Sequence, residues 1–96
     1  GPMLQVQFVD TFEEAIEAAN NTKYGLAAGL ISDNKNLFNE FVDRVNAGVI
    51  NFNSTTTGAS GAFPFGGIGR SGNLRPAGYY AADYCAWPKA SIIKQL

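Results

Sequence analysis

The sequence predicts an α/β fold, a βαβαβ arrangement followed by an extended tail strand. Residues 4–8 alternate apolar and polar side chains, the pattern of a strand buried on one face. Residues 12–19 and 37–45 carry apolar side chains at helical spacing, and 26–32 and 49–53 are short apolar runs typical of buried strands. Strands that alternate with helices of this length form βαβ units with right-handed crossovers and a parallel or mixed sheet.

The first helix carries a clear start signal. Thr11 is followed three residues later by Glu14, which is the spacing of a capping box. Glu13, Glu14 and Glu17 place negative charge near the helix amino terminus, where the helix dipole favours it, and otherwise form a solvated face. We expect the helix to end near Asn20.

The second helix is expected to begin near Asn34 and to end before Gly48. Its apolar stripe comprises Leu37, Phe38, Phe41, Val42 and Val45. The strand that follows leads directly into residues 55–72, which hold six of the eleven glycines.

In this glycine-rich segment Arg70 is the only charged residue, and Phe63 and Phe65 flank Pro64. Flexible linkers rarely carry two phenylalanines, so we expect a shaped loop pressed against protein or ligand. Clustered glycines let backbone amides point at a small polar group, and sites in such sheets lie beyond the carboxyl ends of strands.

Beyond the loop, Pro76 is placed for the first turn of a short helix that ends near Cys85. The chain then divides into residues 1–83, the main domain, and 84–96, a tail strand that we expect to pair with another subunit or domain. Gly1-Pro2 is either native or the remnant of a removed tag.

Composition restricts the possible functions. The chain has 96 residues, a net charge of −1 and a pI near 5.1, and this charge gives no reason to expect a nucleic-acid or membrane partner. No apolar run approaches the roughly 20 residues that span a bilayer, and no signal peptide is evident, so we expect a cytoplasmic protein. Without histidine, and with Cys85 as the only cysteine, the chain cannot form its own zinc site, histidine-based triad or disulfide. Because Asp83 lies nearby and disfavours a thiolate, we expect Cys85 to be a buried structural cysteine.

Two features of the loop have alternative interpretations. Residues 67–72 match G-x-G-x-x-G, but residues 63–65 and 73–76 are not the strand and helix that a dinucleotide site needs immediately before and after it. Arg70 and Arg75 could hold a carboxylate by paired hydrogen bonds or could equally form surface ion pairs.

The loop hydroxyls, on residues 55–57 and Ser60, lack a histidine or nearby lysine to accept their protons. We therefore expect them to form turn hydrogen bonds rather than to act as nucleophiles.

Three motifs occur in order along the chain. EAI-x-x-A-N-x-T-x-Y-G-L-x-A-G spans 14–29, A-G-x-x-x-x-N spans 47–53 and P-F-G-G-x-x-x-S-G spans 64–72. Together they resemble the closing portion of the NAD-dependent aldehyde dehydrogenases. Within this family, TGAS at 57–60 and the block at 71–91 are most similar to members that oxidise N-succinylglutamate 5-semialdehyde in arginine catabolism.

The resemblance implies a carboxyl-terminal fragment that supplies only part of an active site. Enzymes of this family attack the aldehyde with a cysteine thiolate, transfer hydride to NAD and hydrolyse the thioester with a glutamate base. The motifs for those groups would precede residue 1, so the resemblance implies no catalytic or cofactor-binding residue in this chain and no activity of the chain alone. Cys85 is not expected to replace the nucleophile.

The resemblance also implies a substrate site. Thr57, Gly58, Ala59 and Ser60 match an anchor loop, whose backbone amides hold the carboxylate of a semialdehyde. Phe65 matches the wall of the aldehyde tunnel.

Asn53 matches an asparagine to which we assign a supporting role in shaping the loop. The tail implies a homo-oligomer. Two rival hypotheses remain, a non-catalytic binding or oligomerisation module and an aldehyde dehydrogenase for another semialdehyde.

Overall fold

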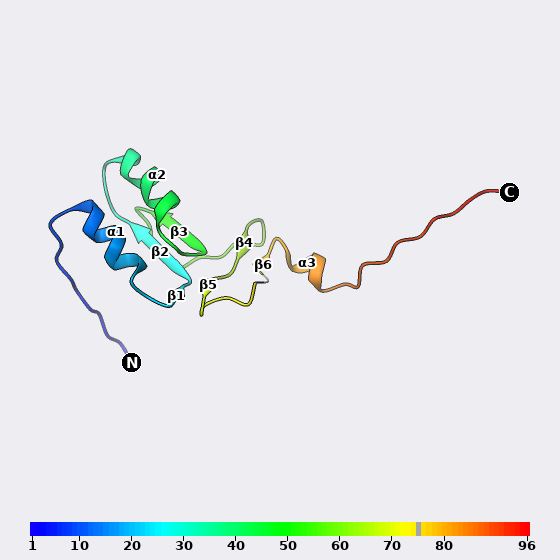
Figure 1. Ribbon diagram of the computed structural model, residues 1–96, viewed down its shortest axis with the longest axis horizontal. Helices are drawn as coiled ribbons and strands as arrows, with labels where there is room; N and C mark the ends of the chain where they lie inside the picture. Colours follow the sequence, from blue (N-terminus) through cyan, green and yellow to red (C-terminus); the bar gives the residue numbers. More distant parts are fainter. Residues whose placement is uncertain (75) are drawn as a thin grey trace.

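The computed structural model describes residues 1–74 and 76–96 and shows two helices on a short parallel sheet, followed by an irregular region and an extended tail (Figure 1). The elements in chain order are α1 (Phe12–Asn20), β1 (Tyr24–Gly25), β2 (Ala27–Leu30), α2 (Lys35–Arg44), β3 (Val49–Phe52), β4 (Pro64–Phe65), β5 (Ile68–Gly69), β6 (Ala77–Gly78) and α3 (Ala81–Tyr84).

Both main helices begin where their caps predict. In α1 the Glu14 amide donates to Thr11 Oγ1 at 3.1 Å, and Glu14 Oε2 in return accepts from the Asp10 amide at 2.9 Å, which closes the predicted capping box one residue earlier than usual. In α2 the side chain of Asn34 accepts from the amides of Asn36 and Leu37. The prediction of both helices is confirmed.

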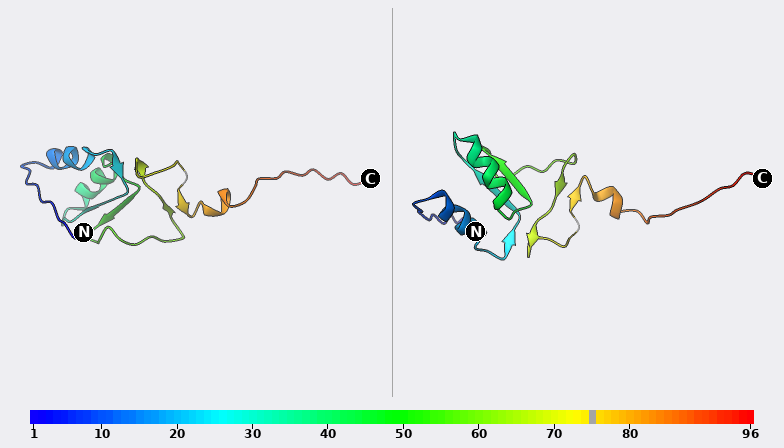
Figure 2. Two further views of the ribbon diagram at one scale, coloured as in Figure 1. Left: turned by 90° about the horizontal axis from the view of Figure 1, so that it is seen from below. Right: turned by 45° about the horizontal axis from the view of Figure 1, so that its top comes forward.

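The centre of the fold is the unit β2–α2–β3. The two strands run parallel, in register from Ala27 opposite Val49 to Leu30 opposite Phe52. Because side chains alternate along a strand, every second residue faces the helices. Figure 2 shows α1 and α2 beside this sheet.

The core lies between these helices and the sheet. The buried residues of the described chain are Ile16 of α1, Phe41 of α2 and Val45, which follows α2, so both helices cover the same face of the sheet. Phe12, Ala28, Leu30, Phe38, Ala47 and Ile50 pack around them. The ring of Phe38 also stacks on Phe52, with centroids 4.6 Å apart.

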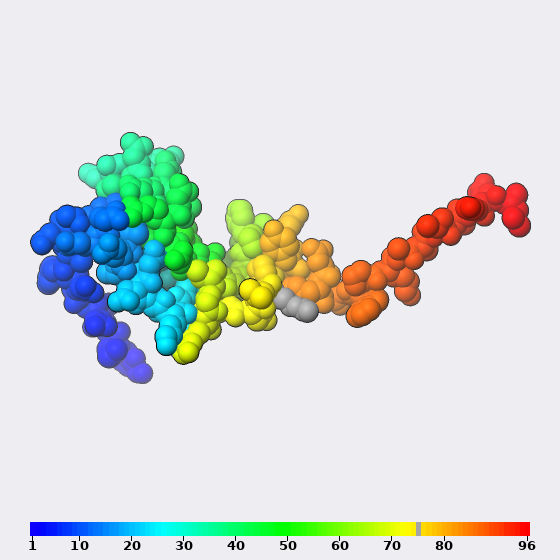
Figure 3. All heavy atoms as spheres, viewed as in Figure 1, coloured from blue at the N-terminus to red at the C-terminus, as the bar shows by residue number. Residues whose placement is uncertain are grey.

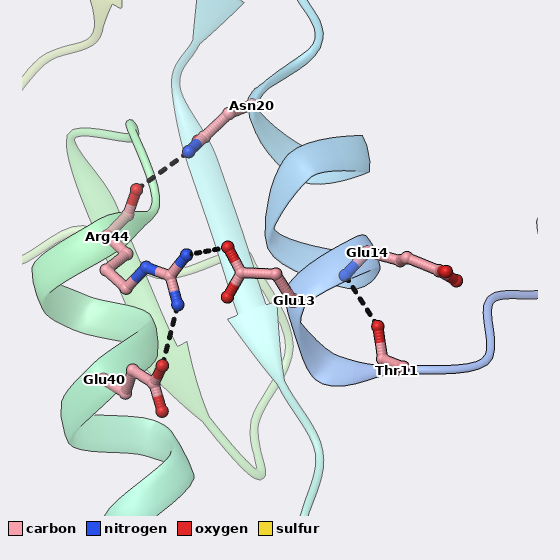
Figure 4. Close-up of polar contacts among 6 residues, drawn as sticks. All are labelled: Thr11, Glu13, Glu14, Asn20, Glu40 and Arg44. Atoms are coloured by element: carbon pink, nitrogen blue, oxygen red, sulfur yellow. Dashed lines mark hydrogen bonds and ion pairs between the residues drawn. The ribbon is translucent and has the colours of Figure 1, made fainter.

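A polar network joins α1 to α2 (Figure 4). The guanidinium of Arg44 pairs with Glu13 on α1 and with Glu40 on its own helix, the latter at 2.7 Å. Asn20 donates from Nδ2 to the Arg44 carbonyl and accepts at Oδ1 from the Asn46 amide, both at 2.8 Å. Glu13, Glu14 and Glu17 are exposed, as expected for a solvated face, but Glu13 also pairs with Arg44, and this hydrogen bond lowers the pKa of its carboxyl group.

The predicted first strand is absent. Residues 1–9 form neither helix nor strand, and Leu4 and Phe8 are 87% and 93% exposed. The predicted βαβαβ order is thus reduced to one βαβ unit preceded by α1. Alternation of apolar side chains indicates which face of a strand is buried, but a strand forms only where another strand accepts its hydrogen bonds.

The glycine-rich region forms two short antiparallel pairs. β1 pairs with β5, and β4 pairs with β6. The helical turn expected at Pro76 is wrong, because β6 begins at the next residue and α3 covers only Ala81–Tyr84.

The molecule is elongated, as the space-filling view in Figure 3 shows. It measures 73 × 33 × 21 Å with a radius of gyration of 18.6 Å, against about 12.5 Å for a compact chain of this length. Residues 87–96 are extended and exposed, without strand pairing. Their pairing with another subunit stays a prediction.

Candidate functional site

The loop at 57–60 leaves from a fixed point at the end of β3. Asn53 adopts a left-handed backbone with φ of 50°. Its Oδ1 accepts from the Ser32 amide and its Nδ2 donates to the Ser32 carbonyl, both at 2.8 Å, while its own amide donates to the Leu30 carbonyl at 2.8 Å. The side chain of Asn53 thereby extends the pairing of β2 with β3 by one step and sets the direction in which the chain leaves the sheet.

The chain then folds back over the sheet face opposite the helices. Asn51 Nδ2 donates to the Thr55 carbonyl at 2.6 Å, and the Thr55 and Thr57 hydroxyls lie 2.7 Å apart. A Cβ atom on Gly29 would lie 3.4 Å from Thr56 Cγ2. Gly29 alternates with core-facing residues of β2, so this contact puts the loop on the uncovered face.

The four predicted carboxylate-binding residues, Thr57, Gly58, Ala59 and Ser60, are all exposed. Gly58 has φ of +105° and no atom within 4 Å of the position of a Cβ. That backbone conformation strains any L residue, so glycine is required by conformation and not by crowding.

Ser60 closes a turn into β4. Its hydroxyl accepts from the Ala62 amide at 3.2 Å and its carbonyl accepts from the Phe63 amide at 3.1 Å. The turn-forming role predicted for this hydroxyl is confirmed.

Phe65 lies on β4, opposite Ala77 of β6, and lines a groove of about 710 Å³. Leu26, Ile68 and Leu74 also line it, whereas residues 57–60 do not. Phe65 and the predicted anchor loop therefore do not line the same groove, and the turn at Ser60 connects them along the chain.

The G-x-G-x-x-G segment does not fit a dinucleotide. β5 lies inside it, and no helix follows it directly in the described part of the chain. A Cβ on Gly72 would lie 1.9 Å from the Gly67 carbonyl oxygen, and one on Gly67 would lie 2.5 Å from Ser71 Cβ. These glycines allow the loop to pack closely against itself.

The other residues that the sequence suggested as candidates are Cys85, Arg70 and Arg75. Cys85 follows α3 and is exposed, so the expectation of a buried cysteine is wrong. The helix α3 has only one turn and no buried residue. Arg70 is exposed, and its amide donates to the Lys23 carbonyl at 2.8 Å. Arg75 lies outside the described residues.

Sequence reasoning overlooked Asn51 and Gly29 because both sit inside apolar strand patterns. The signal that could have revealed Asn51 is a polar amide within the run Val49-Ile50-Asn51-Phe52. In the described part of the chain no group of acidic or cysteine side chains is arranged to hold a metal ion. No helix there is long and apolar enough to cross a bilayer.

Comparison with known proteins gives consistent matches. Residues 1–90 match the aldehyde dehydrogenase family. N-succinylglutamate 5-semialdehyde dehydrogenase 2 of Caulobacter vibrioides is 60% identical over 91 residues, which are 95% of this chain and 19% of that protein. An Escherichia coli protein named N-succinylglutamate 5-semialdehyde dehydrogenase is 53% identical over 92 residues, or 96% of this chain and 19% of the relative.

Solved structures give the same result. Betaine aldehyde dehydrogenase of Staphylococcus aureus is 27% identical and superposes with a TM-score of 0.80 over 88% of this chain and 17% of its own. An NAD⁺ complex of an aldehyde dehydrogenase from Bacillus cereus is 40% identical, with a TM-score of 0.71 over 78% of this chain and 15% of its own. The chain spans about 19% of the curated relatives it matches. It belongs to the aldehyde dehydrogenase family.

Proposed function

We propose that this chain is part of an NAD-dependent enzyme that oxidises N-succinylglutamate 5-semialdehyde, and that it holds a carboxylate of that substrate. The substrate is inferred from relatives named for this activity, which are 53% to 60% identical over nearly the whole chain. The cofactor is inferred from aldehyde dehydrogenase relatives, one of them solved with NAD⁺.

One observation supports the binding role of the loop above all others. The backbone amides of residues 57–61 donate to no acceptor in the described part of the chain, and Gly58 turns the backbone with positive φ. Exposed, unpaired amides in a turned loop are available to donate hydrogen bonds to an anion. Two or three such bonds to a carboxylate contribute about 1.5–3 kcal/mol each.

The chain alone is proposed to be inactive. Its only thiol, Cys85, is exposed at the end of a one-turn helix, and the glycines at 67–72 pack against one another. The thiolate, the glutamate base and the NAD site of the family are proposed to come from the remainder of the whole protein.

The direct test is NADH formation by the whole protein that contains this chain. N-succinylglutamate 5-semialdehyde should be oxidised with a higher kcat/KM than glutamate 5-semialdehyde or an unsubstituted aliphatic aldehyde. The isolated chain should form no NADH and should show no saturable binding of NAD. A higher kcat/KM for another semialdehyde would contradict the substrate, and saturable NAD binding by the chain would contradict the division of roles.

The rival proposal, an assembly module, has one specific observation in its favour. Trp87, Ile92 and Ile93 are 89%, 91% and 87% exposed along the tail. Such side chains are typical of a segment that is covered by a partner. The two proposals are compatible, because the tail can join subunits of the enzyme while the loop binds substrate.

A further inference from the structure

The side chain of Asn51 is not needed by the sheet that carries it. The ladder between β2 and β3 uses only backbone groups, and Asn51 lies half-buried opposite Gly29, on the sheet face that the helices do not cover. An amide at such a position gains little from burial. Its one described contact is the bond from Nδ2 to the Thr55 carbonyl at 2.6 Å.

We propose that Asn51 is the positioning residue of the anchor loop and thereby sets the affinity of the enzyme for the carboxylate of its substrate. This inference rests on the proposed function, because it concerns the same loop. Asn51 acts through other residues and touches no substrate.

The connection from Asn51 to the loop is continuous. Asn51 holds the carbonyl of Thr55, and the hydroxyl of Thr55 lies 2.7 Å from that of Thr57, the first of the four loop residues. Each of these bonds restricts the conformation of the residues just before Gly58. Amides that are already oriented bind an anion more tightly, because less ordering remains to be done on binding.

Two further contacts define the path over which Asn51 acts. Asn53, bonded twice to the backbone of Ser32, fixes the point where the chain leaves the sheet. Gly29 is the floor beneath the loop, because a Cβ there would be in van der Waals contact with Thr56 Cγ2 at 3.4 Å and with the Ser54 carbonyl oxygen at 3.7 Å. With the start and the floor fixed, the bond from Asn51 decides where residues 55–57 lie.

The test is steady-state kinetics of Asn51→Asp in the whole enzyme. The carboxylate has almost the shape of the amide but cannot donate to Thr55, so KM for N-succinylglutamate 5-semialdehyde should rise roughly tenfold. The kcat of the reaction and the KM for NAD should each change less than twofold. Asn39→Asp on the exposed surface of α2 makes the same chemical change away from the loop and should leave all three constants unchanged.

Two more variants keep the inference testable if Asn51→Asp does not fold. Asn51→Gln retains the donor, so its KM should lie between those of the wild type and the Asp variant. Thr55→Val removes the next hydrogen bond in the series with little change of shape and should also raise KM for the semialdehyde alone.

Equal changes in KM for the semialdehyde and for NAD, or a loss of kcat alone, would overturn the inference, because they indicate general structural damage. The variant Gly58→Val distinguishes a failure of the inference about Asn51 from a failure of the proposed function. If Gly58→Val raises KM for the semialdehyde while the Asn51 and Thr55 variants do not, only the inference fails. If Gly58→Val has no effect, the proposed function fails and the inference with it.

Discussion

Arg44 and Asn20 make the polar contacts between the two core helices. The ion pair of Arg44 with Glu13 joins side chains that are 35% and 58% exposed, so water and salt screen it and it adds little. Asn20 makes two hydrogen bonds to backbone groups at the end of α2, each worth about 0.5–1.5 kcal/mol. Asn20 is therefore the more important residue of this network, because its side chain, at the end of α1, bonds to backbone groups at the end of α2.

The same pair of Arg44 with Glu13 gives the chain a small pH dependence. The hydrogen bond from Arg44 lowers the pKa of Glu13 below its ordinary value of 4.5, so Glu13 binds protons less readily in the folded chain than in the unfolded chain. Its stabilising effect is complete above pH 4.5 and is lost as the pH falls through the lowered value.

In urea unfolding, Glu13→Gln should therefore destabilise the chain near pH 7, and the difference from wild type should shrink as the pH falls below 4.5. Glu17→Gln, an equivalent change on the exposed face of the same helix, is the control and should show no such convergence. A difference that stays constant from pH 7 to pH 2 would refute the role of this pair.

For individual residues, the sequence predicted local interactions well and distant ones poorly. The bond of Thr11 to Glu14 spans three residues and follows from spacing alone. The bonds of Asn20 to Arg44 and of Asn53 to Ser32 span 24 and 21 residues and depend on how the helices and strands pack. Family motifs marked these asparagines, but their partners required the structure.

The same contrast holds for whole elements. Helices α1 and α2 satisfy their own backbone groups, so their caps and apolar stripes were sufficient to predict them. The strand expected at 4–8 needs a neighbouring strand, which the described chain does not offer it. The pairs β1–β5 and β4–β6 have two residues per strand, which is too short for any periodic pattern.

Helix α1 is held to the fold mainly by one buried side chain. Ile16 is 3% exposed and lies in the core with Phe41 and Val45. We expect Ile16→Ala to reduce the free energy of unfolding by about 2–4 kcal/mol, measured in urea by circular dichroism.

The matched control is Ile31→Ala, since Ile31 is 86% exposed and should change the free energy by less than about 0.5 kcal/mol. Equal effects of the two changes would show that α1 does not pack as described.

The molecule as a whole exposes more surface than its size requires. Its accessible area is 8282 Å², whereas a compact protein of 10.2 kDa exposes about 5,300 Å². The excess is comparable to the surface that a permanent protein interface buries, and the exposed apolar side chains of the two extended ends contribute to it. In the whole protein, we expect other segments or subunits to cover these regions.

The isolated chain should therefore self-associate. Light scattering after size-exclusion chromatography should give an average mass that rises with protein concentration, because open strand edges and the apolar tail pair between copies. Replacing Ile92 and Ile93 by lysine should reduce this association, while Lys89→Glu, a charge change in the same tail, should not. A monomer at every concentration would contradict the prediction.

Kinetics with two aldehydes tests whether residues 57–60 hold a substrate carboxylate, as we propose. In the whole enzyme, kcat/KM is measured for N-succinylglutamate 5-semialdehyde and for an aldehyde of equal length without carboxylates, with wild type and Gly58→Val. Because φ at residue 58 is +105°, valine must distort the loop. We expect a loss of about 10- to 100-fold for the semialdehyde and less than twofold for the uncharged aldehyde. Equal losses for both aldehydes would show that the loop does not bind the carboxylate.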